Sequence, residues 1–292
     1  MKAMILAAGL GTRLRPLTND RPKALVEVAG RTLLEIALAR LRAFGVSEAI
    51  VNAHHFAEMI VEYLKANSNF GMKIEVSREE ELLDTGGGLK KAAHFFGDSD
   101  EPFILHNVDV ISEIDLGQMA RQHKEQNALA TLAVQERTTS RYLLFDDAGL
   151  LCGRRAGRDG PVEMARPAER FEPLAFSGIH VISPRIFGKM TEQGAFSIID
   201  AYLRLAAEGE RIAAFRADGA YWRDLGRPES VAERPQSGLR RDQGSESRGQ
   251  RLSPIDALIL RRPSAAAWRW IPPPIFWRQI PLFLWVTGWI AL

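Results

Sequence analysis

Hydrophobic and polar positions in the first part of the chain follow two alternating patterns. Short apolar runs that end in polar residues or glycine are typical of buried parallel strands, and they occur at residues 3–6, 49–53, 73–77 and 103–106. Segments of helical length separate these runs. Strands that alternate with helices favour βαβ units. The pattern therefore predicts an α/β fold, a Rossmann-like open and mostly parallel sheet with helices on both faces.

The helices between these strands have recognisable boundaries. Thr32 and Glu35 have the spacing of a capping box, which predicts a helix through about Phe44. A second helix is predicted from apolar residues that recur on one helical face at Phe56, Met59, Ile60, Tyr63 and Leu64. A third is expected at residues 89–96, after three consecutive glycines.

The pattern changes after about residue 128. Strands are predicted at 128–135, 142–145, 175–182 and 212–216, and a helix at 196–207. A turn of hairpin type at residues 146–149 leads into a further short strand at 150–153. These elements predict a small antiparallel extension of the sheet, within one domain that covers residues 1–233.

The composition breaks again in the tail, residues 234–292. Residues 234–262 are rich in Arg, Ser, Gln and Gly without periodicity, which predicts low order. Five of the six tryptophans lie after residue 263. Only eleven residues follow Pro281, however, and a membrane-spanning helix needs about 20. Membrane contact of the tail is therefore not expected, although anchoring through tryptophan stays an alternative. Non-native sequence, for example after a change of reading frame, is another explanation.

Charge and cysteine content exclude several functions. A net charge of +2 with dispersed basic residues gives no patch for nucleic acid, so we expect no such partner. The single cysteine, Cys152, rules out an internal disulfide and a cysteine-rich metal site. The apolar stretch before Gly9 is too short for a signal peptide, and a cytoplasmic location is expected.

The first strand runs into a glycine-rich loop with the chemistry of a phosphate site. Gly9 and Gly11 allow backbone N–H groups to turn toward an anion. The dinucleotide fingerprint fails because Leu14 stands where its third glycine belongs, and the Gly-Lys-Ser/Thr of a P-loop is missing. Arg13 and Lys23 follow instead, and both are suited to a polyphosphate. We therefore predict a phosphate site.

Residues 6–18 and 21–25 together closely resemble the pyrophosphorylase loop of sugar-1-phosphate nucleotidylyltransferases. Other features of that family recur in order at residues 84–88, 107–109, 176–180 and 222–226. The resemblance covers residues 1–233 and none of the tail. Residues 85–88 are similar to those of the small single-domain N-acetylmuramate-1-phosphate uridylyltransferase and mannose-1-phosphate guanylyltransferase types.

The resemblance implies a role for each motif. Arg13 would contact the departing pyrophosphate, Lys23 would neutralise charge at the α-phosphorus, and Asp109 would complete the catalytic set. Asp109 follows a strand at its carboxyl end, where open α/β sheets bind ligands, and the family places it with Asp224 on Mg²⁺. The residues expected to bind the nucleotide are Leu6, Ala7, Ala8, Gly9, Gly11, Thr12, Arg13, Lys23, Thr85, Gly86, Gly87 and Asn107, with the backbone of Gly86 and Gly87 facing the base.

Fewer motifs indicate the part of the site that binds the sugar. Residues expected to bind the sugar are Asn107, Gly153, Glu163, Arg166, Ser177 and Gly178. Two departures from the family occur. Val108 replaces the glycine that often precedes the metal aspartate, and Ala165-Arg166-Pro167 replaces the usual Glu-Lys-Pro. Arg166 would then hold the sugar phosphate in place of that lysine, although the two side chains differ in shape.

The resemblance therefore predicts an enzyme that converts a nucleoside triphosphate and a sugar 1-phosphate into a nucleotide sugar and pyrophosphate. UTP with N-acetylmuramate 1-phosphate or a related hexose phosphate is favoured, which implies a place in cell-wall nucleotide-sugar synthesis. GTP with mannose 1-phosphate is the alternative. The enzyme is expected to be a monomer or homodimer.

A metal-dependent glycosyltransferase of GT-A type, with residues 107–109 as its Asp-x-Asp, is a second alternative. Arg13 and Lys23 argue against it, because that class has no triphosphate to hold. A catalytically inactive relative that senses a nucleotide sugar is a third, which the joint presence of Lys23, Asp109 and Asp224 disfavours.

Overall fold

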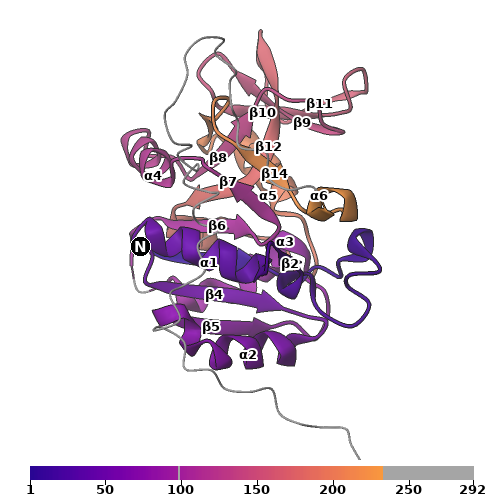
Figure 1. Ribbon diagram of the computed structural model, residues 1–292. Helices are drawn as coiled ribbons and strands as arrows, with labels where there is room; N and C mark the ends of the chain where they lie inside the picture. The colour runs from indigo at the N-terminus through magenta and orange to yellow at the C-terminus, as the bar shows by residue number, and fades with distance from the viewer. Residues whose placement is uncertain (98, 233–292) are drawn as a thin grey trace, which may run out of the picture. The chain divides into compact units, whose positions relative to one another are not determined.

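The computed structural model describes residues 1–97 and 99–232, and these form a sheet of ten strands (Figure 1). Eight of the strands follow the order β11-β10-β9-β12-β6-β1-β4-β5, while β8 pairs with β12 and β13. The strands are β1 (Lys2–Leu6), β4 (Glu48–Ala53), β5 (Lys73–Arg78), β6 (Phe103–Asn107), β8 (Ala130–Gln135), β9 (Arg141–Asp146), β10 (Leu151–Ala156), β11 (Val162–Met164), β12 (Phe171–Ile182) and β13 (Ile212–Arg216).

The first half of the sheet is parallel. Strand β1 lies between β4 and β6 and is parallel to both, and β4 is parallel to β5. The central residues of β1, Ala3, Met4 and Ile5, are fully buried, as expected for a strand covered on both faces. The parallel arrangement brings the carboxyl ends of β1 and β6 to one edge of the sheet.

The second half is mainly antiparallel. Strand β12 is antiparallel to β6, β8 and β9, and β9, β10 and β11 continue as an antiparallel meander, whereas β13 is parallel to β8. The hairpin turn predicted between β9 and β10 is present, with the Gly149 N–H donating to the Asp146 carbonyl at 2.8 Å. The predicted fold, a mostly parallel α/β sheet with an antiparallel extension, is confirmed.

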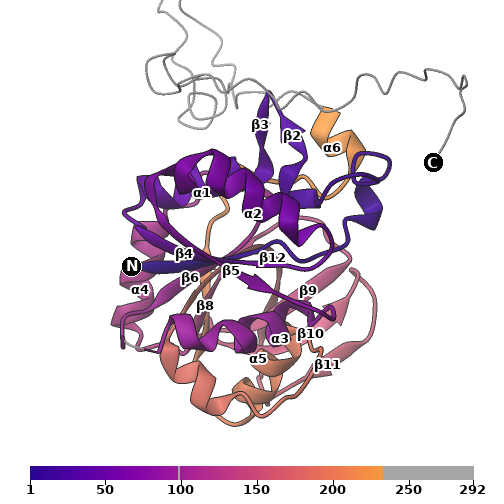
Figure 2. The same cartoon turned by 90° about the horizontal axis from the view of Figure 1, so that it is seen from below.

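Helices cover both faces of the sheet (Figure 2). Buried residues of α1 (Leu33–Ala43), α2 (Ala57–Ala66) and α4 (Leu116–Glu125) belong to one apolar core, and those of α3 (Asp84–Lys91) and α5 (Ile198–Ala207) to the other. The remaining helical segments are a short helix α6 (Pro228–Ala232) and 3₁₀ turns at Thr12–Leu14, Lys23–Leu25, Ser68–Gly71, Ala92–Phe95 and Pro184–Lys189. Two small two-stranded ribbons pair β2 (Glu27–Val28) with β3 (Arg31–Thr32) and β7 (Val110–Ser112) with β14 (Trp222–Asp224).

Some predicted boundaries are confirmed and others are wrong. Thr32 caps α1 by accepting the Glu35 N–H at 3.1 Å, as its sequence predicts. The helix expected at 89–96 instead begins at Asp84 and contains all three glycines, with a 3₁₀ turn from Ala92. Helix α4 was missed, although Asp115 caps it by accepting the Gln118 N–H and could have marked its start.

Three buried histidines make the fold sensitive to acid. Burial lowers the pKa of His106 and His123 to about 4 and that of His180 to about 3. Between these values and about 6.5 the unfolded chain binds protons that the folded chain does not, so stability falls as pH falls through this window. Each histidine contributes a slope of about 1.4 kcal/mol per pH unit.

We expect His180→Gln to reduce the slope of the free energy of unfolding against pH between about pH 4.5 and 6 by up to about 1.4 kcal/mol per pH unit. Urea unfolding at several pH values measures it, with His55→Gln, whose side chain is exposed, as the control. An unchanged slope in His180→Gln would show that this histidine titrates alike in the folded and the unfolded chain, and would refute the lowered pKa.

The tail lies outside the described residues, so the boundary predicted at residue 233 remains a prediction. Among residues 1–97 and 99–232, no helix combines the length and the apolar character that a membrane crossing needs.

Candidate active site at the carboxyl edge of the sheet

The ribbon of β7 and β14 brings two distant carboxylates together. Asp109 lies between β6 and β7, immediately before Val110, and Asp224 ends β14 opposite Val110 in the register of the ribbon. The Leu225 N–H donates to the Asp109 carbonyl at 2.8 Å, which fixes the two chain segments side by side. The structure therefore places Asp109 and Asp224 at the edge where β1 and β6 end.

Two basic side chains from the first loop reach the same place. Lys23 forms an ion pair with Asp109. A Cβ atom built on Gly226 would lie 2.7 Å from Asp224 Oδ1, 3.0 Å from Arg13 Nη2 and 3.1 Å from Asp109 Oδ2. Arg13, Asp109 and Asp224 thus share one small volume around Gly226, which has space there for no side chain.

The electrostatics of this cluster suit a divalent cation. Burial and the negative charge of Asp109 raise the pKa of Asp224, and the Gly226 N–H, Lys23 and Arg13 oppose that rise. Two carboxylates that repel one another are stabilised by a hard cation that prefers oxygen ligands, and Mg²⁺ is such a cation. In the described part of the chain no group of three or more His, Cys, Asp or Glu side chains is placed to hold a metal. A metal held by these two carboxylates therefore needs further oxygen ligands, which substrate phosphates and water supply.

The glycine-rich loop has unused donors. Within the described residues, the backbone N–H groups of Ala8, Gly9, Leu10 and Gly11 donate no hydrogen bond to the protein. Gly11 has a φ of +65°, and a Cβ there would lie 2.9 Å from Thr18 Cγ2, so only glycine fits. Successive free N–H groups in such a turn form an anion-binding concavity. The loop therefore has the backbone geometry expected of a phosphate site.

A buried polar bridge, which the sequence analysis missed, positions this loop. Asn52 at the end of β4 accepts the Ala7 N–H at 2.7 Å and donates to Glu79 at 2.7 Å, and Glu79 also accepts the Leu83 N–H at 3.1 Å. Asn52 and Glu79 are only 2% and 5% exposed. A polar Asn near the end of an otherwise apolar strand was the available signal. The bridge ties the phosphate loop to the start of α3.

Gly86 and Gly87 lie inside α3 rather than in a loop. Their N–H groups both donate to the Phe196 carbonyl, at 2.9 and 3.4 Å, while Thr85 Oγ1 accepts the N–H of Ile198 at the start of α5. These contacts hold α3 against the segment before α5. The contact of Thr85, Gly86 and Gly87 with a nucleobase remains a prediction, and it does not use these N–H groups.

The close packing of α3 makes Gly87 irreplaceable. A Cβ on Gly87 would lie 2.4 Å from the backbone oxygen of Gly194, so Gly87→Ala must displace the main chain. We expect a loss of about 1–3 kcal/mol in the free energy of unfolding, the range for overpacked sites. Gly219→Ala, where a Cβ meets nothing within 4 Å, is the matched control. Equal denaturant midpoints for the two variants would refute the expected clash.

The residues predicted to bind the sugar divide into two groups. Gly178 has a φ of +75° and a Cβ there would lie 2.9 Å from Asn107 Nδ2, so Asn107 and Gly178 lie together beside β7. Ser177 is fully buried and its hydroxyl lies 3.4 Å from Gln135 Oε1, so it points into the protein. Val108 is also buried and belongs to the apolar core, and its N–H donates to the Leu6 carbonyl.

The other three lie in the antiparallel extension. Glu163 on β11 is paired with Arg154, and Gly153 packs so closely on β11 that a Cβ would lie 2.5 Å from the Glu163 carbonyl. Arg166 donates to the Leu151 carbonyl at 2.9 Å and pairs with Asp146, so it braces the β9–β10 hairpin. Within the described residues no hydrogen bond or ion pair joins these three to the Asp109 cluster, and their sugar-binding roles remain predictions.

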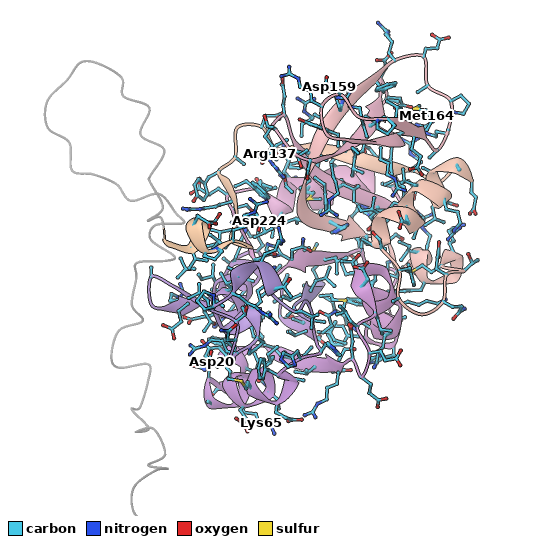
Figure 3. All side chains as sticks on the ribbon, turned by 90° about the vertical axis from the view of Figure 1, so that its right-hand side faces the viewer. Asp20, Lys65, Arg137, Asp159, Met164 and Asp224 are labelled. Carbon is cyan, nitrogen blue, oxygen red and sulfur yellow. The ribbon has the colours of Figure 1, made fainter. Side chains whose placement is uncertain are left out.

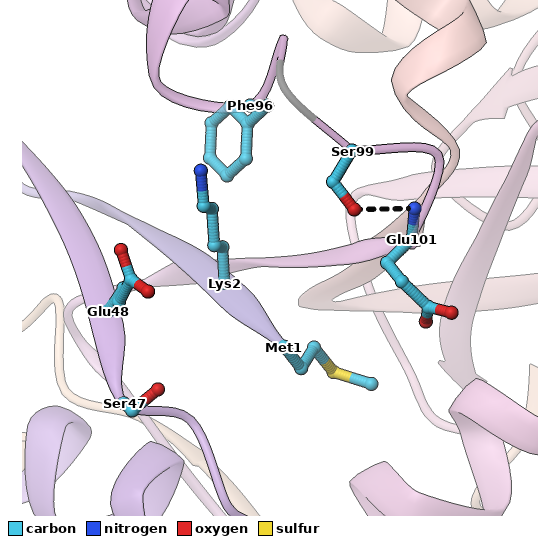
Figure 4. Close-up of a pocket in the computed structure, with 7 residues that line it drawn as sticks. All are labelled: Met1, Lys2, Ser47, Glu48, Phe96, Ser99 and Glu101. Carbon is cyan, nitrogen blue, oxygen red and sulfur yellow. Dashed lines mark hydrogen bonds between the residues drawn. The ribbon is translucent and has the colours of Figure 1, made fainter.

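A pocket at the opposite edge of the sheet is a different feature (Figure 4). It is lined by Met1, Lys2 and Glu48 at the amino ends of β1 and β4, and by Phe96, Ser99 and Glu101 before β6. Open α/β sheets bind ligands at the carboxyl ends of their strands. This pocket therefore gives no support to a second catalytic site.

Comparisons with known proteins show the family of this chain. Residues 2–147 match the family described as nucleotidyl transferase. An N-acetylmuramate alpha-1-phosphate uridylyltransferase of Caulobacter vibrioides is 37% identical over 237 residues, which cover 78% of this chain and 93% of that protein. A mannose-1-phosphate guanyltransferase of Yarrowia lipolytica is 31% identical over 230 residues, which cover 78% of this chain and 61% of that protein. The chain belongs to the nucleotidyl transferase family.

Solved structures show the same fold. The crystal structure of HddC from Yersinia pseudotuberculosis matches with a TM-score of 0.63 at 24% identity, over 78% of this chain and 95% of that one. A UDP-glucose pyrophosphorylase complexed with UDP-glucose matches with a TM-score of 0.62 at 20% identity, over 79% and 95%. Together with the family membership, these matches confirm the expected fold and enzyme class, a sugar-1-phosphate nucleotidyltransferase.

Proposed function

We propose that this enzyme uses Mg²⁺ to join UTP to N-acetylmuramate 1-phosphate, releasing pyrophosphate and a nucleotide sugar. The observation that supports this reaction type is the convergence of four side chains on one point, namely Arg13, Lys23, Asp109 and Asp224. The choice of nucleotide and sugar rests on similarity to the Caulobacter uridylyltransferase, which this chain spans almost completely. A cytoplasmic location and a role in cell-wall precursor synthesis follow from the same choice.

The chain's own groups can supply most of the chemistry. The free N–H groups of residues 8–11 bind the triphosphate, and Arg13 holds the departing pyrophosphate through its planar fork. Lys23 pairs with Asp109, which places its positive charge at the reacting centre. There it balances the negative charge that grows at the α-phosphorus. A sugar phosphate is already an anion at neutral pH, so the attack needs no general base. Mg²⁺ held by Asp109 and Asp224 supplies charge neutralisation and orientation of the phosphates.

GTP with mannose 1-phosphate is the second candidate. It is supported by the guanyltransferases among the relatives, of which this chain spans about three fifths. Pyrophosphate release by the full chain, measured over four nucleoside triphosphates and several sugar 1-phosphates, separates the two. We expect the highest kcat/KM for UTP with N-acetylmuramate 1-phosphate. A preference for GTP with mannose 1-phosphate would overturn the first assignment in favour of the second.

A further inference from the structure

Arg137 occupies a position that no sequence motif marks. It follows β8, and its guanidinium carbon lies 3.7 Å from the centre of the Trp222 ring. One of its nitrogens, Nη2, donates to the Phe176 carbonyl at 2.7 Å, and Trp222 Nε1 donates to the neighbouring Ser177 carbonyl at 2.8 Å. The guanidinium is therefore held in one orientation by stacking and by a hydrogen bond.

This position is next to the metal carboxylates. Trp222 and Asp224 are two residues apart on β14, so they project from the same face of the strand with a separation of roughly 6.5 Å along it. Figure 3 shows Arg137 and Asp224 on the same side of the molecule, with Asp20 of the first loop beyond Asp224. Burial lowers the pKa of Arg137, and the charge of Asp224 opposes that effect.

The guanidinium lacks a counter-ion. Among residues 1–97 and 99–232, no carboxylate lies within ion-pair distance of Arg137, and its buried Nε atom has no hydrogen-bond partner. Arg166 and Arg204, in contrast, are both paired with carboxylates. A half-buried guanidinium that pairs with no carboxylate is costly, and an anionic ligand would reduce that cost.

A basic side chain from elsewhere in the chain packs against each end of the segment 222–226. Arg137 lies on Trp222, Asp224 is in the middle, and Arg13 lies beside Gly226. In-line displacement at phosphorus puts the attacking and the leaving oxygens on opposite sides of the reacting centre. Arg13, from the triphosphate loop, is on the side of the leaving pyrophosphate. If Arg13 holds the pyrophosphate, Arg137 would lie on the side from which the sugar phosphate attacks.

We propose that Arg137 binds the phosphate of the sugar 1-phosphate and holds it for attack. This inference deepens the proposed function and rests on it. It gives Arg137 the role that the sequence suggested for Arg166, whose guanidinium is instead tied to Asp146 and to the Leu151 carbonyl.

Arg137→Met tests the proposal, because methionine keeps an apolar stem against Trp222 while removing the charge. We expect KM for the sugar 1-phosphate to rise at least about tenfold, the scale of a lost charge-assisted hydrogen bond, and KM for the nucleoside triphosphate to stay within about twofold. Arg137→Lys should recover part of the loss. Arg185→Met, at the opposite edge of the sheet near Asn127, is the matched control and should leave both KM values unchanged.

A second readout separates binding from folding. Calorimetric titration of the full-length protein should show that the wild type prefers the sugar 1-phosphate over the same sugar without phosphate, and that Arg137→Met loses this preference while its thermal midpoint is retained. An active wild type whose Arg137→Met variant keeps both its KM and this preference overturns the role of Arg137 alone. Absence of pyrophosphate release from the wild type with every sugar 1-phosphate overturns the proposed function, and the role of Arg137 with it.

Discussion

Replacing Asp109 or Asp224 by Asn is expected to lower turnover at least about a hundredfold, the scale for losing one electrostatic group at a reacting centre. Each change removes one of two carboxylates that converge near Gly226 and would hold the metal. Because the two carboxylates act on the same ion, the double variant should be little slower than either single variant.

Steady-state rates at several Mg²⁺ concentrations measure this effect. The Mg²⁺ concentration for half-maximal rate should rise in Asp109→Asn and Asp224→Asn. Asp20→Asn is the matched control, since Asp20 is exposed and paired with its neighbour Arg21. Rates within threefold of the wild type in either single variant would exclude a shared metal site.

Lys23→Ala is expected to cause a loss in kcat of similar size, again at least about a hundredfold. Lys23 is the side chain that pairs with Asp109, and its removal takes away a positive charge from a cluster that holds two carboxylates. Lys23→Arg should remain slow. Arginine does not substitute for lysine at a shaped site, because a broad planar fork replaces a compact point charge.

The loss in Lys23→Ala should fall on kcat more than on KM for the nucleoside triphosphate, because the charge it balances grows during the reaction. Lys65→Ala, on the surface of α2 away from the cluster, serves as its control (Figure 3). A variant Lys23→Ala that changes only KM would place Lys23 in ground-state binding.

Local signals predicted the elements of this fold well. The capping pair Thr32 and Glu35, the apolar runs of the parallel strands and the turn before Gly149 each depend on neighbouring residues, and each was found where the sequence indicated. The start of α3 was misplaced because glycine is a poor helix former. Contacts with Phe196 and Gly194 outweigh that preference and require glycine inside the helix.

The site was predicted less evenly. Arg13, Lys23, Asp109 and Asp224 were named from their motifs, but their convergence depends on the pairing of β7 with β14, which no local pattern marks. The bridge through Asn52 and Glu79, and the stacking of Arg137 on Trp222, likewise join distant segments. Such contacts form only when the sheet is assembled, so a single sequence read in short windows does not show them.

The position of bond cleavage tests the reaction most directly. Full-length enzyme, Mg²⁺ and the sugar 1-phosphate should be incubated with UTP labelled at the α-phosphorus and, separately, at the γ-phosphorus. Attack at the α-phosphorus predicts that the α-label appears in the nucleotide sugar and the γ-label in pyrophosphate. Release of the γ-label as orthophosphate, or recovery of the α-label in UDP, would contradict it.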